Sequence, residues 1–216
     1  MSGSVEAAVL SSSERPWLYY ITDRSQIPEG GLLGVVRRVL RGGIDFVQVR
    51  EKDLPDGRLV QLTARIVEIA RPRGCRVLVN GRADVALAAA ADGVHLPSAG
   101  LRPGDVRPWV PPGFLIGVSV HGVDEARVAE ASGADYVLAG PVYATPSKLK
   151  YGKPMGIPGL ARVCRAVRIP VFGLGGIRAG SIPEVTGAGA AGIAAIRLFQ
   201  REPRLLRCAS LRPARR

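Results

Sequence analysis

Three long polar side chains occupy alternate positions of one apolar segment, FVQVREK at residues 46–52. Side chains of a β-strand alternate between its two faces, so Gln48, Arg50 and Lys52 would share one face and the two valines between them the other. The polar face could bind an anionic ligand, or it could simply contact water. This segment alone leaves both interpretations open.

A pair of glycines, Gly175-Gly176, lies near the end of the apolar segment VFGLGGI at residues 171–177 and precedes a helical pattern. Glycines let backbone N–H groups approach an anion, and the N-terminus of a following helix adds a partial positive charge. The alternative is that the pair only permits a tight turn. If the fold is an α/β barrel, phosphate binding is the favoured interpretation, because the loops after its last two strands commonly form a phosphate site.

The long segment AGPVYATPSKLKYGKPMG at residues 139–156 is rich in glycine, proline, hydroxyl groups and lysine. Thr145 and Ser147 offer hydroxyl groups and Lys148 offers an ammonium group, a combination that suits an oxyanion. Long loops of this kind are usually functional or disordered. We favour oxyanion capture over a solvated loop.

The chain has two histidines, and both lie at the ends of predicted strands. His121 closes the segment IGVSVH, and Ser119 lies two residues earlier on the same face. Histidine is the usual proton shuttle near neutral pH, but this spacing fits a catalytic and a structural role equally well. His95 lies between Val94 and Leu96, and we interpret it as a structural residue below the strand ends.

Short apolar segments alternate with amphipathic ones from residue 18 onward, a pattern that predicts alternating strands and helices. The predicted strands are residues 18–23, 46–51, 76–81, 92–96, 115–120, 135–143, 170–176 and 192–198. The predicted helices are residues 32–41, 57–72, 83–91, 124–132, 157–167, 180–188 and 200–208, and a proline-rich interval around 101–112 holds at most a short helix.

Eight strand–helix units in 216 residues predict an α/β protein that is a single-domain (β/α)8 TIM barrel. We expect it to span residues 17–208, between an N-terminal extension at 1–16 and a basic tail at 209–216. An open doubly wound sheet is the alternative, but no glycine-rich fingerprint follows the first strand. In a barrel the carboxyl ends of the strands carry the active site, so the polar face of residues 46–52 would look into the barrel mouth.

The net charge of +12 raises the question of nucleic-acid binding. Residues 197–216 hold seven arginines and one acidic residue, so about half of the excess charge lies in the tail, and no nucleic-acid-binding motif is found. The three cysteines have no metal-ligand spacing, and neither a signal peptide nor an apolar stretch of about 18 residues occurs. We therefore expect a cytoplasmic protein with no specific nucleic-acid partner, no membrane partner and no structural metal.

Several of these segments together resemble the thiamine phosphate synthase and thiazole tautomerase superfamily, from Tyr19 to about Phe199. The resemblance rests on YYITDR, GGIDFVQVREKDL, VNGRADVAL, ADGVHL, IGVSVH, GADYVLAGPVYATPSK, IPVFGLGGI and GAAGIAA, in this order. It implies that a polar, anion-binding mouth is lined by Gln48, Arg50, Lys52, Asn80, Ser119, Thr145, Ser147 and Lys148. It also implies that a thiazole phosphate is held by Gly175, Gly176, Ala195 and Ile196.

Two positions depart from the synthase pattern. By the resemblance, synthases join a hydroxymethylpyrimidine diphosphate to thiazole phosphate and hold magnesium on the diphosphate with two aspartates. This chain has Gly81 and Gly100 at those positions, and the nearby Asp84 and Asp105 do not match the motif. Magnesium in proteins usually takes one or two carboxylates together with phosphate oxygens. We therefore expect no cofactor, and Mg²⁺ only if the chain is a synthase.

The thiazole tautomerase branch is the closer resemblance, because it carries a histidine in a Ser-Val-His stretch, here Ser119-Val120-His121. Such enzymes convert a non-aromatic carboxythiazole phosphate to its aromatic tautomer, and one imidazole can move the proton without a metal. We expect an isomerase of thiamine biosynthesis in which His121 is catalytic and the ring carboxylate is oriented by Gln48, Arg50 and Lys52.

Two alternatives stay open: a thiamine phosphate synthase, which is a transferase, and a non-catalytic regulator that binds a phosphate ligand. The resemblance also suggests a homodimer. The role of Arg197, where the family usually has a serine, is left undecided: it either contacts the ligand or begins the basic tail.

Overall fold

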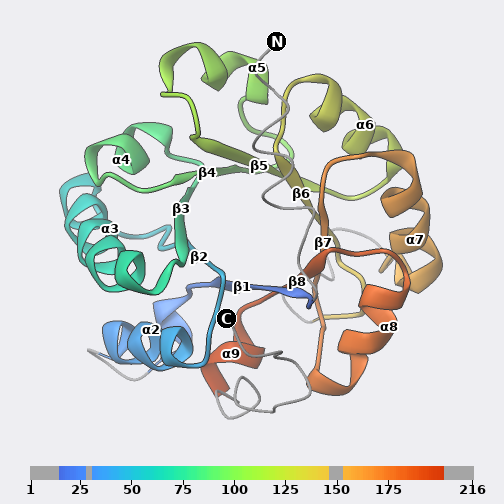
Figure 1. Ribbon diagram of the computed structural model, residues 1–216, viewed down its shortest axis with the longest axis horizontal. Coiled ribbons are helices and arrows are strands. Elements are labelled where there is room, and N and C mark those ends of the chain that lie inside the picture. The colour runs from blue at the N-terminus through green and yellow to red at the C-terminus, as the bar shows by residue number, and fades with distance from the viewer. Residues whose placement is uncertain (1–14, 28–30, 146–152, 202–216) are drawn as a thin grey trace.

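The computed structural model of the protein describes residues 15–27, 31–145 and 153–201. These residues form a closed barrel of eight parallel strands, in which each strand pairs with the next along the chain and β1 pairs with β8 (Figure 1). The predicted single-domain (β/α)8 barrel is therefore confirmed. The strands are β1 (Trp17–Ile21), β2 (Phe46–Val49), β3 (Arg76–Asn80), β4 (Gly93–Leu96), β5 (Leu115–Val120), β6 (Tyr136–Ala139), β7 (Val171–Leu174) and β8 (Gly192–Ala195).

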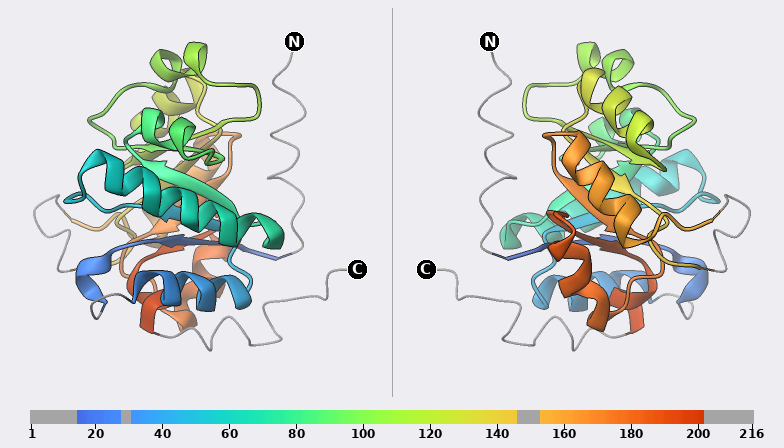
Figure 2. Two further views of the ribbon diagram at one scale, coloured as in Figure 1. Left: turned by 90° about the vertical axis from the view of Figure 1, so that its left-hand side faces the viewer. Right: turned by 90° about the vertical axis from the view of Figure 1, so that its right-hand side faces the viewer.

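Helices follow the strands and cover the outside of the barrel (Figure 1 and Figure 2). They are α2 (Leu32–Arg41), α3 (Asp56–Ala70), α4 (Ala83–Ala88), α5 (Pro103–Val106), α6 (Val123–Ala131), α7 (Gly156–Ala166), α8 (Ile182–Gly187) and α9 (Arg197–Arg201). Short 3-10 turns occur at η1 (Arg24–Gln26), η2 (Arg71–Arg73), η3 (Arg107–Trp109) and η5 (Ala179–Ser181). Among the described residues no helix is long and apolar enough to cross a membrane.

Most strands end earlier than the sequence pattern predicts. β2 ends at Val49, so Arg50 and Lys52 follow the strand instead of lying in it. β8 ends at Ala195, and Arg197 begins α9 instead of continuing the strand. The hydrophobic pattern extends past the rim of the barrel, but a strand beyond the rim has no neighbour that continues its hydrogen-bond ladder. The predicted extension at 1–16 and the tail at 209–216 fall almost wholly outside the described residues and stay predictions.

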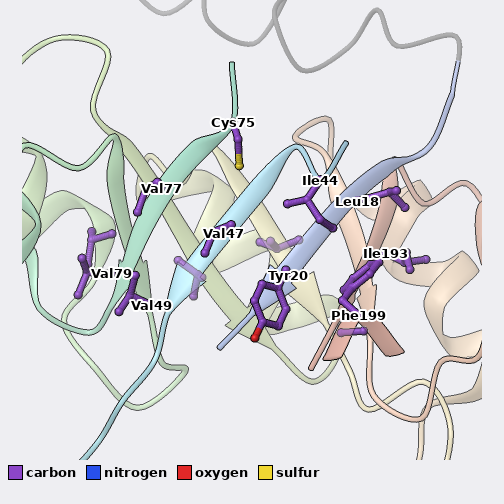
Figure 3. Close-up of a cluster of buried hydrophobic side chains, with 14 of the residues drawn as sticks. Leu18, Tyr20, Ile44, Val47, Val49, Cys75, Val77, Val79, Ile193 and Phe199 are labelled. Atoms are coloured by element: carbon purple, nitrogen blue, oxygen red, sulfur yellow. The ribbon is translucent and has the colours of Figure 1, made fainter. Parts of the chain in front are cut away.

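The two faces of β2 have different environments. Val47 and Val49 point outward into the apolar layer between the sheet and the helices, together with side chains of β1 and β3 (Figure 3). Phe46 points inward and stacks on Tyr19, with ring centroids 5.5 Å apart. Gln48 shares this inward face and is 1% exposed. The alternation of residues 46–49 therefore separates the outer apolar layer from the barrel interior.

A buried or half-buried aspartate directly precedes each of β2, β4 and β6. Each carboxylate accepts a hydrogen bond from a backbone N–H of the preceding strand, at 2.6–2.9 Å, and each pairs with an arginine. The three sets are Asp45 with Leu18 and Arg15, Asp92 with Val77 and Arg76, and Asp135 with Ile116 and Arg107. Ala191 stands at the equivalent position before β8, so this carboxylate clamp is missing between β7 and β8.

The strands β2, β4, β6 and β8 are each also preceded, three positions before the strand begins, by a residue with left-handed backbone. The φ angle is 81° at Gly43, 88° at Gly133 and 98° at Gly189, but the residue before β4 is Ala90, with φ 52°. A side chain in this conformation is strained, because its Cβ approaches the following carbonyl oxygen. Ala90 is therefore a point of backbone strain at which the other three units have glycine.

We expect Ala90→Gly to raise the free energy of unfolding by about 1 kcal/mol, because glycine adopts positive φ without a steric penalty. Urea denaturation measures the change. Gly133→Ala is the matched control and should lower stability by a similar amount, since no atom lies within 4 Å of the added Cβ and only the backbone strain changes. Equal stability of Ala90→Gly and the unmodified protein would contradict the strain at this position.

Candidate active site at the barrel mouth

A chain of hydrogen bonds crosses the barrel interior below its mouth. Nε2 of Gln48 donates to the hydroxyl of Tyr19 at 3.0 Å, and this hydroxyl lies 2.9 Å from that of Tyr136. The Tyr136 hydroxyl lies 3.3 Å from Nδ1 of His95, and Nε2 of His95 lies 2.8 Å from the hydroxyl of Ser119. Five strands thus contribute to one connected polar network.

The direction of this chain follows from its fixed end. The side-chain amide nitrogen of Gln48 can only donate, so the Tyr19 oxygen accepts from it. Burial raises the pKa of both Tyr19 and Tyr136, so both hydroxyls keep their protons. The orientation in which Tyr19 donates to Tyr136 and Tyr136 donates to Nδ1 of His95 gives each of these protons an acceptor.

His95 then carries its proton on Nε2 and donates to the oxygen of Ser119. In this orientation the hydroxyl proton of Ser119 is not used within the chain of hydrogen bonds, and Ser119 is half-buried near the end of β5. Ser119 would therefore present a donor to a ligand. The structural interpretation of His95 is accordingly extended: His95 is 2% exposed, yet it connects a predicted ligand-binding serine to the buried network.

Replacing Tyr136 by phenylalanine removes the hydroxyl that connects Tyr19 to His95. We expect the free energy of unfolding to fall by about 1–2 kcal/mol, because two buried hydrogen bonds are lost. We also expect the tautomer of His95 to shift away from Nε2–H, which ¹⁵N NMR of the imidazole measures.

Tyr20→Phe is the control for this experiment. The hydroxyl of Tyr20 accepts a hydrogen bond from Gln200 at 3.2 Å on the outer side of the barrel, so its loss should leave His95 unchanged. An unaltered ¹⁵N pattern of His95 in Tyr136→Phe would contradict the direction assigned to the chain.

His121 follows β5 directly and is half-buried. Its Nδ1 lies 2.5 Å from the backbone carbonyl oxygen of Gly140, which follows β6. A carbonyl oxygen only accepts, so Nδ1 is the donor and Nε2 is the nitrogen that can take up a proton. The backbone N–H of His121 donates to the carboxylate of Glu125 at 2.9 Å, which fixes the start of the turn.

The cationic residues after β2 differ in exposure. Arg50 is half-buried, and its backbone N–H donates to the hydroxyl of Thr22 at 2.9 Å. Burial alone would raise the pKa of Asp23, but hydrogen bonds from Ser25 and Gln26, together with the nearby charge of Arg50, hold this pKa below its usual value. The positive charge of Arg50 therefore acts on Asp23, which lies at the rim after β1.

The remaining predicted residues lie at several strand ends. Lys52 is exposed, and Asn80 is half-buried at the end of β3. Thr145 is 8% exposed and accepts a hydrogen bond from Arg197 at 3.3 Å. Ser147 and Lys148 lie outside the described residues. Most described members of the predicted set therefore meet at the carboxyl end of the barrel, and their roles in binding stay predictions.

The glycine pair after β7 has left-handed backbone, with φ 100° at Gly175 and 67° at Gly176. A Cβ at Gly176 would lie 2.7 Å from that of Tyr143 and 2.9 Å from the carbonyl oxygen of Ala144. Only glycine allows this close approach of the loops after β6 and β7. Next to them at the end of β8, Ala195 is buried and Ile196 is half-buried.

The two positions at which the resemblance implies magnesium ligands lie on either side of Pro97. A Cβ at Gly81 would be 3.7 Å from Cδ of Pro97, and one at Gly100 would be 3.2 Å from the same atom. Asp84 pairs with Arg82, and Asp105 accepts from the backbone of Arg102. No group of three potential metal ligands occurs among the described histidine, cysteine, aspartate and glutamate residues. The two positions at which the resemblance implies magnesium ligands therefore offer no carboxylate to the ion.

Sequence reasoning missed the buried part of this site. Tyr19 and Tyr136 lie in segments that read as plain apolar strands, and the sequence carries no signal that their hydroxyls meet. Their positions share the inward face of their strands with other core residues. The adjacent Tyr20 points outward, so the sequence indicates neither which tyrosine faces inward nor which polar partner it finds.

A family model described as thiamine monophosphate synthase matches residues 18–199. The chain belongs to this family. It is 48% identical to a putative thiamine-phosphate synthase of Geobacter sulfurreducens, over 86% of this chain and 87% of the relative. It is 46% identical to a thiamine-phosphate synthase of Solidesulfovibrio magneticus, over 72% of this chain and 74% of that protein.

A solved structure gives the same family. Thiamine phosphate pyrophosphorylase from Pyrococcus furiosus superposes with a TM-score of 0.79 and 34% sequence identity, covering 88% of this chain and 93% of that one. The predicted superfamily is thus confirmed, and the relatives are named as thiamine biosynthesis enzymes. Their names give no support to the predicted tautomerase branch and agree with the alternative, the synthase.

Proposed function

We propose that the protein is a transferase that forms thiamine phosphate from a hydroxymethylpyrimidine diphosphate and a thiazole phosphate. The observation that carries this proposal is the identity of 48% and 46% to relatives named as putative or assigned thiamine-phosphate synthases, over most of both chains. The cationic and hydrogen-bonding side chains at the barrel mouth support it, because both substrates are anionic. This function replaces the isomerase that we favoured from the sequence.

The reaction is a substitution at carbon. The ring nitrogen of the thiazole attacks the methylene carbon of the pyrimidine, a C–N bond forms, and the C–O bond to the diphosphate breaks. The diphosphate leaves with the electron pair of that bond. Preorganised positive charge beside such a leaving group stabilises the transition state more than the ground state.

We assign this task to Arg50 and Lys52, which follow β2 at the rim. Gly175 and Gly176, with Ala195 and Ile196, would hold the phosphate of the thiazole. Ser119, whose hydroxyl proton is not used within the buried chain in its assigned direction, would donate to an acceptor atom of a substrate ring.

A second function, tautomerisation of a carboxythiazole phosphate, is favoured by one observation. The positions of both implied magnesium ligands are glycine, whereas His121 is held by Gly140 with Nε2 as its proton-accepting nitrogen. Nε2 would remove a proton from one ring carbon and return one to the exocyclic carbon, and the gain of aromaticity drives the conversion. This reaction needs no metal.

The two functions are separated by assaying both reactions with the same protein. For the synthase we expect thiamine phosphate from the two phosphorylated precursors with Mg²⁺ in solution, detected by chromatography. For the tautomerase, proton–deuterium exchange on the carboxythiazole phosphate would proceed equally in EDTA. No thiamine phosphate from the complete mixture would contradict the proposal, and ligand binding without either reaction would favour the regulator.

His121→Ala tests the role of the imidazole in each reaction. In the synthase reaction a C–N bond forms as diphosphate leaves, and no proton is transferred. We therefore expect the rate of thiamine phosphate formation to fall only slightly. A tautomerase would lose about 10²–10⁴ in rate, because general acid–base catalysis typically contributes that factor. His121→Asn is the matched control: its amide can still donate to the Gly140 carbonyl but cannot shuttle a proton. A fall in coupling of about 10²-fold or more in both variants would contradict the limited role of His121 in the synthase.

A further inference from the structure

Arg197 lies across the barrel mouth from the loop after β6. It is the first residue of α9, two positions beyond the end of β8, and its side chain is exposed. Nη2 of its guanidinium donates to Oγ1 of Thr145 at 3.3 Å. Because β7 lies between β6 and β8 in the barrel, this hydrogen bond passes over the carboxyl end of β7.

The loop that carries Thr145 is fixed against the glycine pair after β7. The backbone N–H of Tyr143 donates to the carbonyl oxygen of Gly175 at 3.0 Å. The carbonyl oxygen of Ala144 lies 2.9 Å from the position that a Cβ of Gly176 would take. Thr145 thus directly follows the two residues that contact the turn at Gly175-Gly176, and its hydroxyl holds the guanidinium of Arg197 on this side of the mouth.

The turn itself presents donors at this point. Gly176 is exposed and Gly175 is half-buried, both with left-handed backbone. Among the described residues, no backbone carbonyl accepts a hydrogen bond from the N–H of either glycine. Successive backbone N–H groups in such a turn form a concave site for an anion. A guanidinium at its edge adds the charge and the fork of donors that suit a phosphate group.

We infer that Arg197 is a specificity-determining residue that binds the phosphate group of the thiazole substrate, with Thr145 as its positioning residue. This inference rests on the proposed function, because it names the anion that the site takes. It decides the question left open by the sequence in favour of ligand contact. Arg197 would make the enzyme select the phosphorylated thiazole over the free alcohol.

The test measures binding without turnover. Inorganic phosphate and thiazole phosphate are titrated into the full-length protein, and the dissociation constants are followed by calorimetry. We expect Arg197→Ala to weaken the binding of both ligands about 10- to 100-fold, since charge-assisted hydrogen bonds to the phosphate oxygens are lost. The unphosphorylated thiazole alcohol should bind the variant and the unmodified protein equally.

Two further variants distinguish a phosphate contact from a general charge effect. Arg201→Ala removes a charge of the same type at the other end of α9 and should leave phosphate affinity unchanged. Arg197→Lys keeps the positive charge but lacks the planar set of guanidinium donors, so it should recover only part of the phosphate affinity that Arg197→Ala loses. Thr145→Val, which removes the hydroxyl, should weaken phosphate binding less than Arg197→Ala.

The inference is overturned if Arg197→Ala binds phosphate as tightly as the unmodified protein, if Arg201→Ala weakens it equally, or if the unmodified protein binds no phosphate. Failure of the coupling assay would leave these binding results valid, so the proposed function and the role of Arg197 can fail separately. Circular dichroism of each variant, matching that of the unmodified protein, excludes unfolding as the cause of a loss.

Discussion

The closure of a parallel sheet is the constraint on which the site depends. Each strand of the closed barrel has two neighbours, so its side chains alternate between the apolar layer under the helices and the barrel interior. All carboxyl ends meet at one rim because the strands are parallel. A polar residue that points inward near a strand end, such as Gln48 or Ser119, can therefore only meet other strands or the mouth.

This constraint explains which features were predictable from the sequence. The periods of two and of about 3.6 residues gave the order of strands and helices, and the inward face of Gln48 followed from the valines beside it. Strand ends were less predictable, since Arg50 and Arg197 continue an apolar pattern but lie where no neighbouring strand remains to pair with them. The partners of Tyr19 and His95 come from distant strands, and no local pattern encodes such contacts.

The mouth offers arginines and backbone N–H groups to an anionic substrate, whereas a metal-assisted transferase would be expected to offer carboxylates that hold a metal ion. The glycines at 81 and 100 meet around Pro97 without side chains, whereas arginines and backbone donors surround the ends of β2, β7 and β8. Cations that belong to the chain bind phosphate oxygens directly and need no coordination geometry. Relatives named as synthases and the glycines at 81 and 100 are compatible if the diphosphate is neutralised mainly by such groups.

The missing aspartate before β8 has a consequence for how the barrel responds to ligands. The pairs β1–β2, β3–β4 and β5–β6 are joined at their amino ends by a carboxylate, but the pair β7–β8 has Ala191 there. The pair β7–β8 is therefore held by its backbone ladder and packing, and an anion bound at its carboxyl end would cross-link the same two strands. Substrate would then strengthen the pairing of β7 with β8, coupling occupancy of the enzyme to its resistance to local opening.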